Sequence, residues 1–206
     1  MSKVSEALAR AAMAWCPRDI LCLGNGPSLG AVDFSLVNIP TMGINKSCRI
    51  HISEFHTMHD HPANWRAYTE AAPQSREILN IGSLPNERRL QRSQILFLFD
   101  PCNRSTERWI CERLGIEYMS HSSGEYALIA CAFLGFRRVW LIGYDSNDGE
   151  GHAKALIKDE ERDYCIDRER MGHARHFEQV AKVMDRLAIQ VINCNPESAI
   201  KCWNFA

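Results

Sequence analysis

The stretch ILCLGNGPSLG, residues 20–30, joins an apolar run to a turn that contains two glycines, a proline and a serine. The apolar run has the length of a buried strand, and glycines after a strand let a ligand approach the backbone closely. In parallel α/β sheets, ligands bind beyond the carboxyl ends of the strands, where the strand order reverses. The stretch predicts the first strand of such a sheet and a ligand-binding loop after it. A plain strand-to-helix turn is the alternative for this loop taken alone.

Short apolar runs alternate with helical patterns along the rest of the chain. This alternation predicts an α/β fold: one Rossmann-like domain over residues 1–206, with a mostly parallel sheet and helices on both faces. The expected strands are Asp19–Leu23, Pro40–Ile44, Glu54–Met58, Glu77–Ile81, Gln94–Phe99, Arg138–Gly143 and Ile189–Asn193. The expected helices are Ser105–Leu114, Gly124–Leu134 and Gly172–Leu187.

Composition and charge exclude several classes of protein. The net charge of the 206 residues is -1, which gives no signal for nucleic-acid binding. No apolar run reaches the roughly 18 residues of a membrane-spanning helix. The nine cysteines include no CxxC pair, so we expect reduced thiols and a cytoplasmic protein. The oligomeric state, including a homo-oligomer, stays open.

One segment, Ser146–Arg170, is dense in charge and too long for an ordinary connection. It is either a solvated surface excursion or a lid over a binding site, since long insertions in α/β domains often cover ligands. The residues alone leave both interpretations open.

Polar residues also end other strands and begin one helix. Asn45 follows the expected strand Pro40–Ile44, and the expected strand Arg138–Gly143 ends in Gly143 and is followed by Tyr144 and Asp145. The serines at 122 and 123 precede a helical pattern and are natural N-caps, and an exposed helix N-terminus favours an anion. Four polar ends directed at one edge of a sheet predict a shared binding site.

With these residues together, the chain resembles the bacterial sialyltransferases of glycosyltransferase family 42 and the related archaeal 6-hydroxymethylpterin diphosphokinases. Five segments carry the resemblance and cover most of the chain. In chain order they are GNGPSL at 24–29, GINKS at 43–47, SSGEYALIACAFLGFRRVWLIGYD at 122–145, GHARHFEQVAKVM at 172–184 and NCNPESAIKCWNF at 193–205. The chain departs from the family by its shorter length and by SHSSG before the expected helix.

The resemblance implies a nucleotide-dependent transferase, a glycosyltransferase that moves a CMP-activated sugar to a hydroxyl acceptor and requires no cofactor. His173 would be the general base, a role that suits an imidazole near neutral pH. Tyr144 and Tyr164 lie nearest to the family's two phosphate-binding tyrosines, and residues 146–170 would be the lid. The expected nucleotide-binding residues are Gly24, Asn25, Gly26, Ser28, Asn45, Asp60, Ser123, Gly124 and Asp145.

Two other functions fit the same residues. A pyrophosphokinase would move diphosphate from ATP to a pterin-like alcohol, and would need Mg²⁺ held by carboxylates such as Asp60 and Asp145. A non-catalytic nucleotide-binding module would use Asn25 and Asn45 but would not need His173.

The stretch FHTMHDHPANW, residues 55–65, concentrates His56, His59 and His61 around Asp60. Such a cluster is compatible with a transition-metal site. The other interpretation is a polar loop after the third strand that lines a donor pocket. We expect no metal in the leading function, and the role of the three histidines stays open.

Overall fold

The computed structural model describes residues 19–59, 66–68, 70, 79–81, 95–99, 104–146, 153 and 173–205. Several expected features lie outside these residues: Asp60, His61, Tyr164 and all of the expected lid except Ser146 and Ala153.

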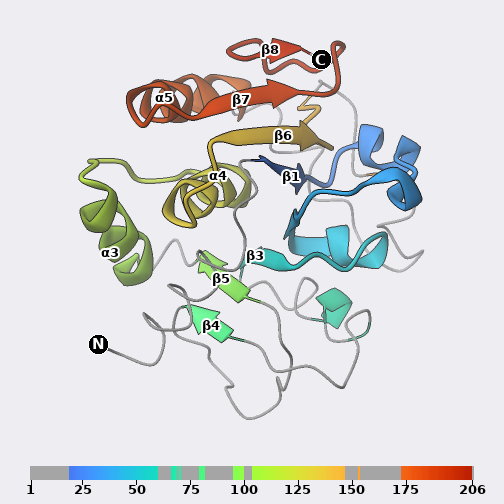
Figure 1. Cartoon of the computed structure of the whole chain (residues 1–206), viewed down its shortest axis with the longest axis horizontal. Coiled ribbons are helices and arrows are strands. Elements are labelled where there is room, and N and C mark those ends of the chain that lie inside the picture. The colour runs from blue at the N-terminus through green and yellow to red at the C-terminus, as the bar shows by residue number, and fades with distance from the viewer. Residues whose placement is uncertain are drawn as a thin grey trace.

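The strands form one sheet of eight strands, in the order β4-β5-β3-β2-β1-β6-β7-β8, and every neighbouring pair is parallel (Figure 1). The α/β class and the parallel sheet are therefore confirmed. The strands are β1 (Asp19–Leu23), β2 (Thr41–Ile44), β3 (Phe55–His59), β4 (Leu79–Ile81), β5 (Ile95–Phe99), β6 (Arg138–Ile142), β7 (Gln190–Asn193) and β8 (Asn204–Phe205).

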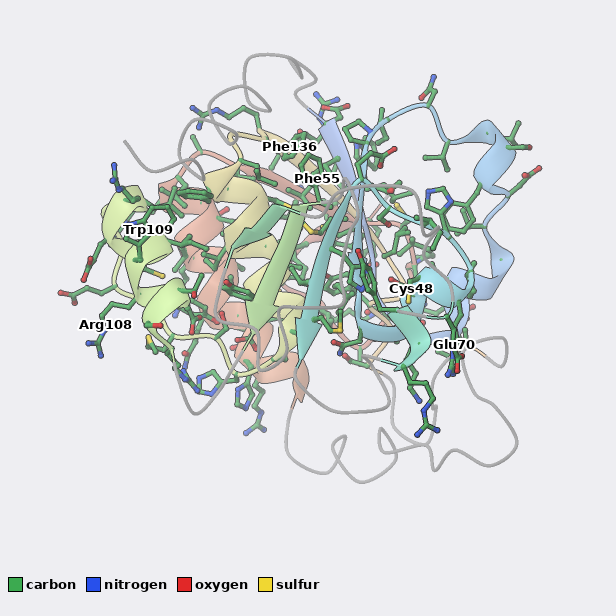
Figure 2. All side chains as sticks on the ribbon, turned by 90° about the horizontal axis from the view of Figure 1, so that it is seen from below. Cys48, Phe55, Glu70, Arg108, Trp109 and Phe136 are labelled. Atoms are coloured by element: carbon green, nitrogen blue, oxygen red, sulfur yellow. The ribbon has the colours of Figure 1, made fainter. Side chains whose placement is uncertain are left out.

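Three α-helices gather on one side of the molecule in Figure 1: α3 (Ser105–Leu114), α4 (Ser123–Phe133) and α5 (His173–Arg186). Helix α4 is apolar around most of its circumference, as a fully buried helix should be. It packs across β1, β2, β3 and β5, with α3 and α5 beside it. Figure 2 shows Phe55 of β3 next to Phe136, and their ring centroids are 5.8 Å apart. No helix in the described parts of the chain is both long and apolar enough to cross a membrane.

The other face of the sheet is covered by short helices. The 3₁₀ helices η1 (Pro27–Ala31) and η2 (Phe34–Leu36) bring Leu29 and Phe34 against the apolar side chains of β1 and β6. Tyr68, from the helical residues 66–68, packs on His56 of β3. A third 3₁₀ helix, η3 (Asn45–Arg49), follows β2 directly.

The strand order reverses at β1. From β1 the chain builds β2, β3, β4 and β5 on one side, and then returns to place β6 on the other side of β1. The loop after β1 therefore lies where the carboxyl edge of a doubly wound sheet binds its ligands.

Candidate functional site

The loop after β1 and the loop after β6 are joined by a short ladder of hydrogen bonds. The backbone N–H of Gly24 donates to the carbonyl of Ile142 at 2.8 Å, and that of Gly26 donates to the carbonyl of Gly143 at 2.8 Å. In return, the Ser28 hydroxyl accepts from the N–H of Gly143 at 2.9 Å. The two loops thus form a single floor at the crossover point.

The glycines of this floor make room for protein atoms. A Cβ atom at Gly24 would collide with the carbonyl of Gly143, and one at Gly26 would collide with the carboxylate of Asp145. The sequence suggested that the loop is bare so that a ligand can approach it. The structure gives a different reason for these two glycines: close contact between the two loops.

The side chain of Asp145, in the loop after β6, links this loop to the loops after β1 and β7. This side chain is buried, and its Oδ2 accepts from the N–H of Ser28 at 2.9 Å. Its Oδ1 accepts from the side-chain amide of Asn195, which follows β7. Because protein donors engage both oxygens, this arrangement lends no support to a Mg²⁺-binding role for Asp145. Within the described residues, no group of three or more His, Cys, Asp or Glu side chains could hold a metal ion.

Asn25, in the loop after β1, has a side-chain oxygen to which no described residue donates a hydrogen bond. This atom, Oδ1, is buried. Leaving such an acceptor unpaired costs about 1–3 kcal/mol, so it points to a missing donor. The carbonyl of Asn25 accepts from the N–H of Ala153 at 2.8 Å, and this bond ties one residue of the expected lid segment to the loop.

The structure brings Asn45 and Ser123 together. Asn45 begins η3 with a left-handed backbone, φ 48°, a conformation that Asn tolerates well. Its Nδ2 lies 3.4 Å from the hydroxyl of Ser123, the first residue of α4. The N-cap of α4 is Ser122, whose hydroxyl accepts from the N–H of Glu125 at 3.3 Å. A polar cluster therefore connects the end of β2 to the N-terminus of α4.

Glu125 has a structural role next to the site that was not predicted from the sequence. Its carboxylate is fully buried, and Oε2 accepts from the Tyr118 hydroxyl at 2.8 Å and from the N–H of His121 at 2.6 Å. These bonds fix the segment that leads into α4. The spacing Ser-x-x-Glu over residues 122–125 is the signal that could have revealed this role, because it is typical of a helix N-terminus with reciprocal capping.

Tyr144, for which the resemblance predicts a phosphate-binding role, lies in the core. Its hydroxyl donates to the carbonyl of Gly124 at 3.2 Å, and its ring packs edge-on against Phe177 of α5. Only 4% of the residue is exposed, and burial raises the pKa of its phenol well above the usual value. A Cβ atom at Gly124 would lie 3.2 Å from this ring, so Gly124 serves the same packing. The pair fixes the N-terminus of α4 against the loop after β6.

The first turn of α5 lies beside the N-terminus of α4. The rings of His121 and His176 meet edge to face, with centroids 4.3 Å apart. His173 is the first residue of α5 and belongs to this same turn. The expected general base is therefore on the helix turn that adjoins the polar cluster.

Of the three clustered histidines, the structure describes the side chain of His56. The ring is 1% exposed on β3, and its Nε2 lies 3.0 Å from the carbonyl oxygen of Asn45. Because a carbonyl oxygen only accepts, Nε2 carries the hydrogen. Burial lowers the pKa of His56 to about 4, so the ring is neutral at neutral pH.

Fold and site together define a Rossmann-like α/β protein with a polar site at the carboxyl edge of a parallel sheet. Among the solved structures to which this fold is similar are two of sialyltransferases. One is "the sialyltransferase CST-II in complex with trisaccharide acceptor and CMP", at 13% identity and TM-score 0.50, covering 91% of this chain and 86% of that one. Another is sialyltransferase CstII from Campylobacter jejuni in complex with the substrate analogue cytidine-5'-monophosphate, at 11% identity and TM-score 0.50, with 91% and 84% covered.

At these identities the likeness concerns the fold, and at that level it confirms the resemblance to the family 42 sialyltransferases. No protein-family model matches the chain, and no curated protein matches it.

Proposed function

We propose that this protein is a glycosyltransferase that binds a CMP-activated sugar at the carboxyl edge of its sheet. The observation that carries the proposal is the buried Oδ1 of Asn25, which accepts no hydrogen bond from the described part of the chain and lies where the strand order reverses. A cytidine nucleotide has hydroxyl and amino donors that could satisfy this acceptor. The shared fold with sialyltransferases that were solved with CMP supports the choice of nucleotide.

The site offers donors for the phosphate as well. Ser123 and Gly124 form the first turn of α4, an 11-residue helix whose N-terminal backbone favours a negative charge. Asn45 lies beside Ser123 and belongs to the same cluster. We place the leaving phosphate near this turn, with Tyr164 of the lid segment as a further donor in place of Tyr144.

In the proposed reaction, an acceptor hydroxyl attacks the anomeric carbon of the donor sugar. The new carbon–oxygen bond forms while the bond from that carbon to the phosphate oxygen breaks, and CMP leaves with the electron pair. His173 takes the proton of the attacking hydroxyl, so the chemistry needs no metal. A closed lid would limit hydrolysis of the donor by excluding water.

A calorimetric titration with CMP and with ATP, each with and without Mg²⁺, tests the proposal. We expect CMP to bind without Mg²⁺ and Asn25→Ala to weaken it about fivefold, the effect of one net hydrogen bond. Asn38→Ala is the matched control, because Asn38 is exposed near the opposite end of β2. Its affinity should equal that of the wild type.

Two results would contradict the proposal. Binding of ATP only with Mg²⁺ would indicate pyrophosphoryl transfer. Absence of CMP binding by the wild-type chain would remove the nucleotide site altogether.

A further inference from the structure

A chain of three residues links the interior of the sheet to the candidate site: His56 of β3, Asn45 after β2 and Ser123 of α4. The imidazole contacts the Asn45 carbonyl at 3.0 Å, and the Asn45 amide contacts the Ser123 hydroxyl at 3.4 Å. We infer that His56 is a positioning residue, which fixes the left-handed backbone of Asn45 and thereby sets the nucleotide site. The inference rests on the proposed function, in which Asn45 contacts the nucleotide.

The structure holds the His56 ring from several directions. On the neighbouring strand, Gly43 is paired with His56, and a Cβ atom at Gly43 would collide with ring atom Nδ1. Tyr68 packs against the ring with centroids 4.8 Å apart and an angle of 41° between the planes. The ring is 1% exposed. A side chain packed in this way has one orientation, so its Nε2–H has one direction.

The bond from His56 acts on Asn45, a residue whose backbone is left-handed, a conformation that most residues avoid and that Asn tolerates. Its φ of 48° turns the chain from β2 into η3 immediately at the sheet edge. The bond from His56 is made to the carbonyl of this same residue, so it acts on the peptide plane that follows the turn. The Cys48 thiol, a weaker donor, also donates to this carbonyl at 3.3 Å. Losing the bond from His56 leaves the carbonyl without the stronger of these two donors, and we expect the peptide plane and the Asn45 side chain to shift.

The neutral state of His56 suits this role better than a role in metal binding. Its Nε2 is engaged by the Asn45 carbonyl as a donor, which leaves no lone pair at that atom for a metal. This gives one member of the histidine cluster a role that the sequence could not assign.

The direct test compares two amide substitutions that differ in reach. The amide nitrogen of His56→Gln reaches the position of Nε2, whereas that of His56→Asn is one methylene shorter. We expect His56→Gln to bind CMP like the wild type and His56→Asn to bind about fivefold more weakly. The matched control is Thr57→Val, which removes the 3.4 Å contact from the neighbouring buried residue of β3 to the Gly43 carbonyl. It should lower the melting temperature without changing CMP affinity.

Two further readouts do not depend on the ligand. Nuclear magnetic resonance should show the His56 hydrogen on Nε2 in the wild-type protein, and the Asn45 backbone shifts should change in His56→Asn but not in His56→Gln. A hydrogen on Nδ1, or equal CMP affinity and Asn45 shifts in all variants, would overturn the inference and leave the proposed function intact. If the wild type does not bind CMP, the proposed function fails, and the tautomer and Asn45 shifts alone decide whether His56 holds Asn45.

Discussion

At the scale of the residue, the burial of His56 makes the stability of the protein depend on pH. Burial lowers the pKa of this histidine from 6.5 to about 4. Between these two values the unfolded chain binds more protons than the folded protein. The free energy of unfolding therefore falls as the pH drops through this window, with a slope of up to ~1.4 kcal/mol per pH unit. Above pH 6.5 the contribution is fully present.

Urea unfolding at several pH values between about 7 and about 4.5 measures this dependence. His56→Gln has no titrating group at this position, so its free energy of unfolding should fall less than that of the wild type. His51, whose pKa burial also lowers, acts in the same direction in both proteins and cancels in the comparison. Equal slopes in the two proteins would show that His56 is not buried as described.

Some single residues of the site could be predicted from the sequence and others could not. Asn25, Asn45 and Ser123 were identifiable because each follows a strand or opens a helix. The core position of Tyr144 was not, because its hydroxyl bonds to the backbone of Gly124, a contact that no local pattern reveals. His56 was noticed only as part of a cluster, and its partner became visible only once β2 and β3 were paired.

At the scale of the element, the loop after β1 should respond very differently to substitution at two of its glycines. Gly24→Ala forces a Cβ atom into the Gly143 carbonyl, and a backbone obstacle cannot rotate away. We expect the free energy of unfolding to fall by about 2 kcal/mol or more. Gly30→Ala is the matched control, because its Cβ atom would meet nothing nearer than Ala153 at 4.0 Å.

Thermal and urea unfolding of the two variants check this expectation. Gly30→Ala should stay within about 0.5 kcal/mol of the wild type. Comparable losses in both variants would mean that the loops after β1 and β6 are not in close contact.

The strands were predictable as elements because their apolar runs are short and end in polar or glycine residues. Each expected strand is present, and within the described residues its limits differ from the expected ones by no more than one residue at either end. Residues 77, 78 and 94 of the expected strands lie outside the described residues. Strand β8 was missed, because two residues, Asn204–Phe205, carry no periodicity. The 3₁₀ helices were missed for the same reason: three to five residues are too few for a helical pattern.

At the scale of the whole molecule, the parallel sheet is what creates the site. Asn25, Asn45 and Asp145 are far apart in sequence, and they meet at one edge because β1, β2 and β6 are adjacent and run in the same direction. Alternating strands and helices predicted the parallel sheet. The strand order was not predictable, because it depends on the side of β1 to which the chain returns, and no local pattern specifies that side.

The measurement that tests the central claim most directly is a nuclear magnetic resonance titration of the labelled wild-type protein with CMP in the absence of Mg²⁺. We expect saturable chemical-shift changes concentrated at Asn25, Asn45 and Ser123, with the side-chain amide of Asn25 among the most affected. Asp19 and Arg138, the first residues of β1 and β6, lie at the opposite ends of these strands and should be unchanged. Absence of saturable shifts, or shifts centred on Asp19 and Arg138, would contradict a nucleotide site at the carboxyl edge of the sheet.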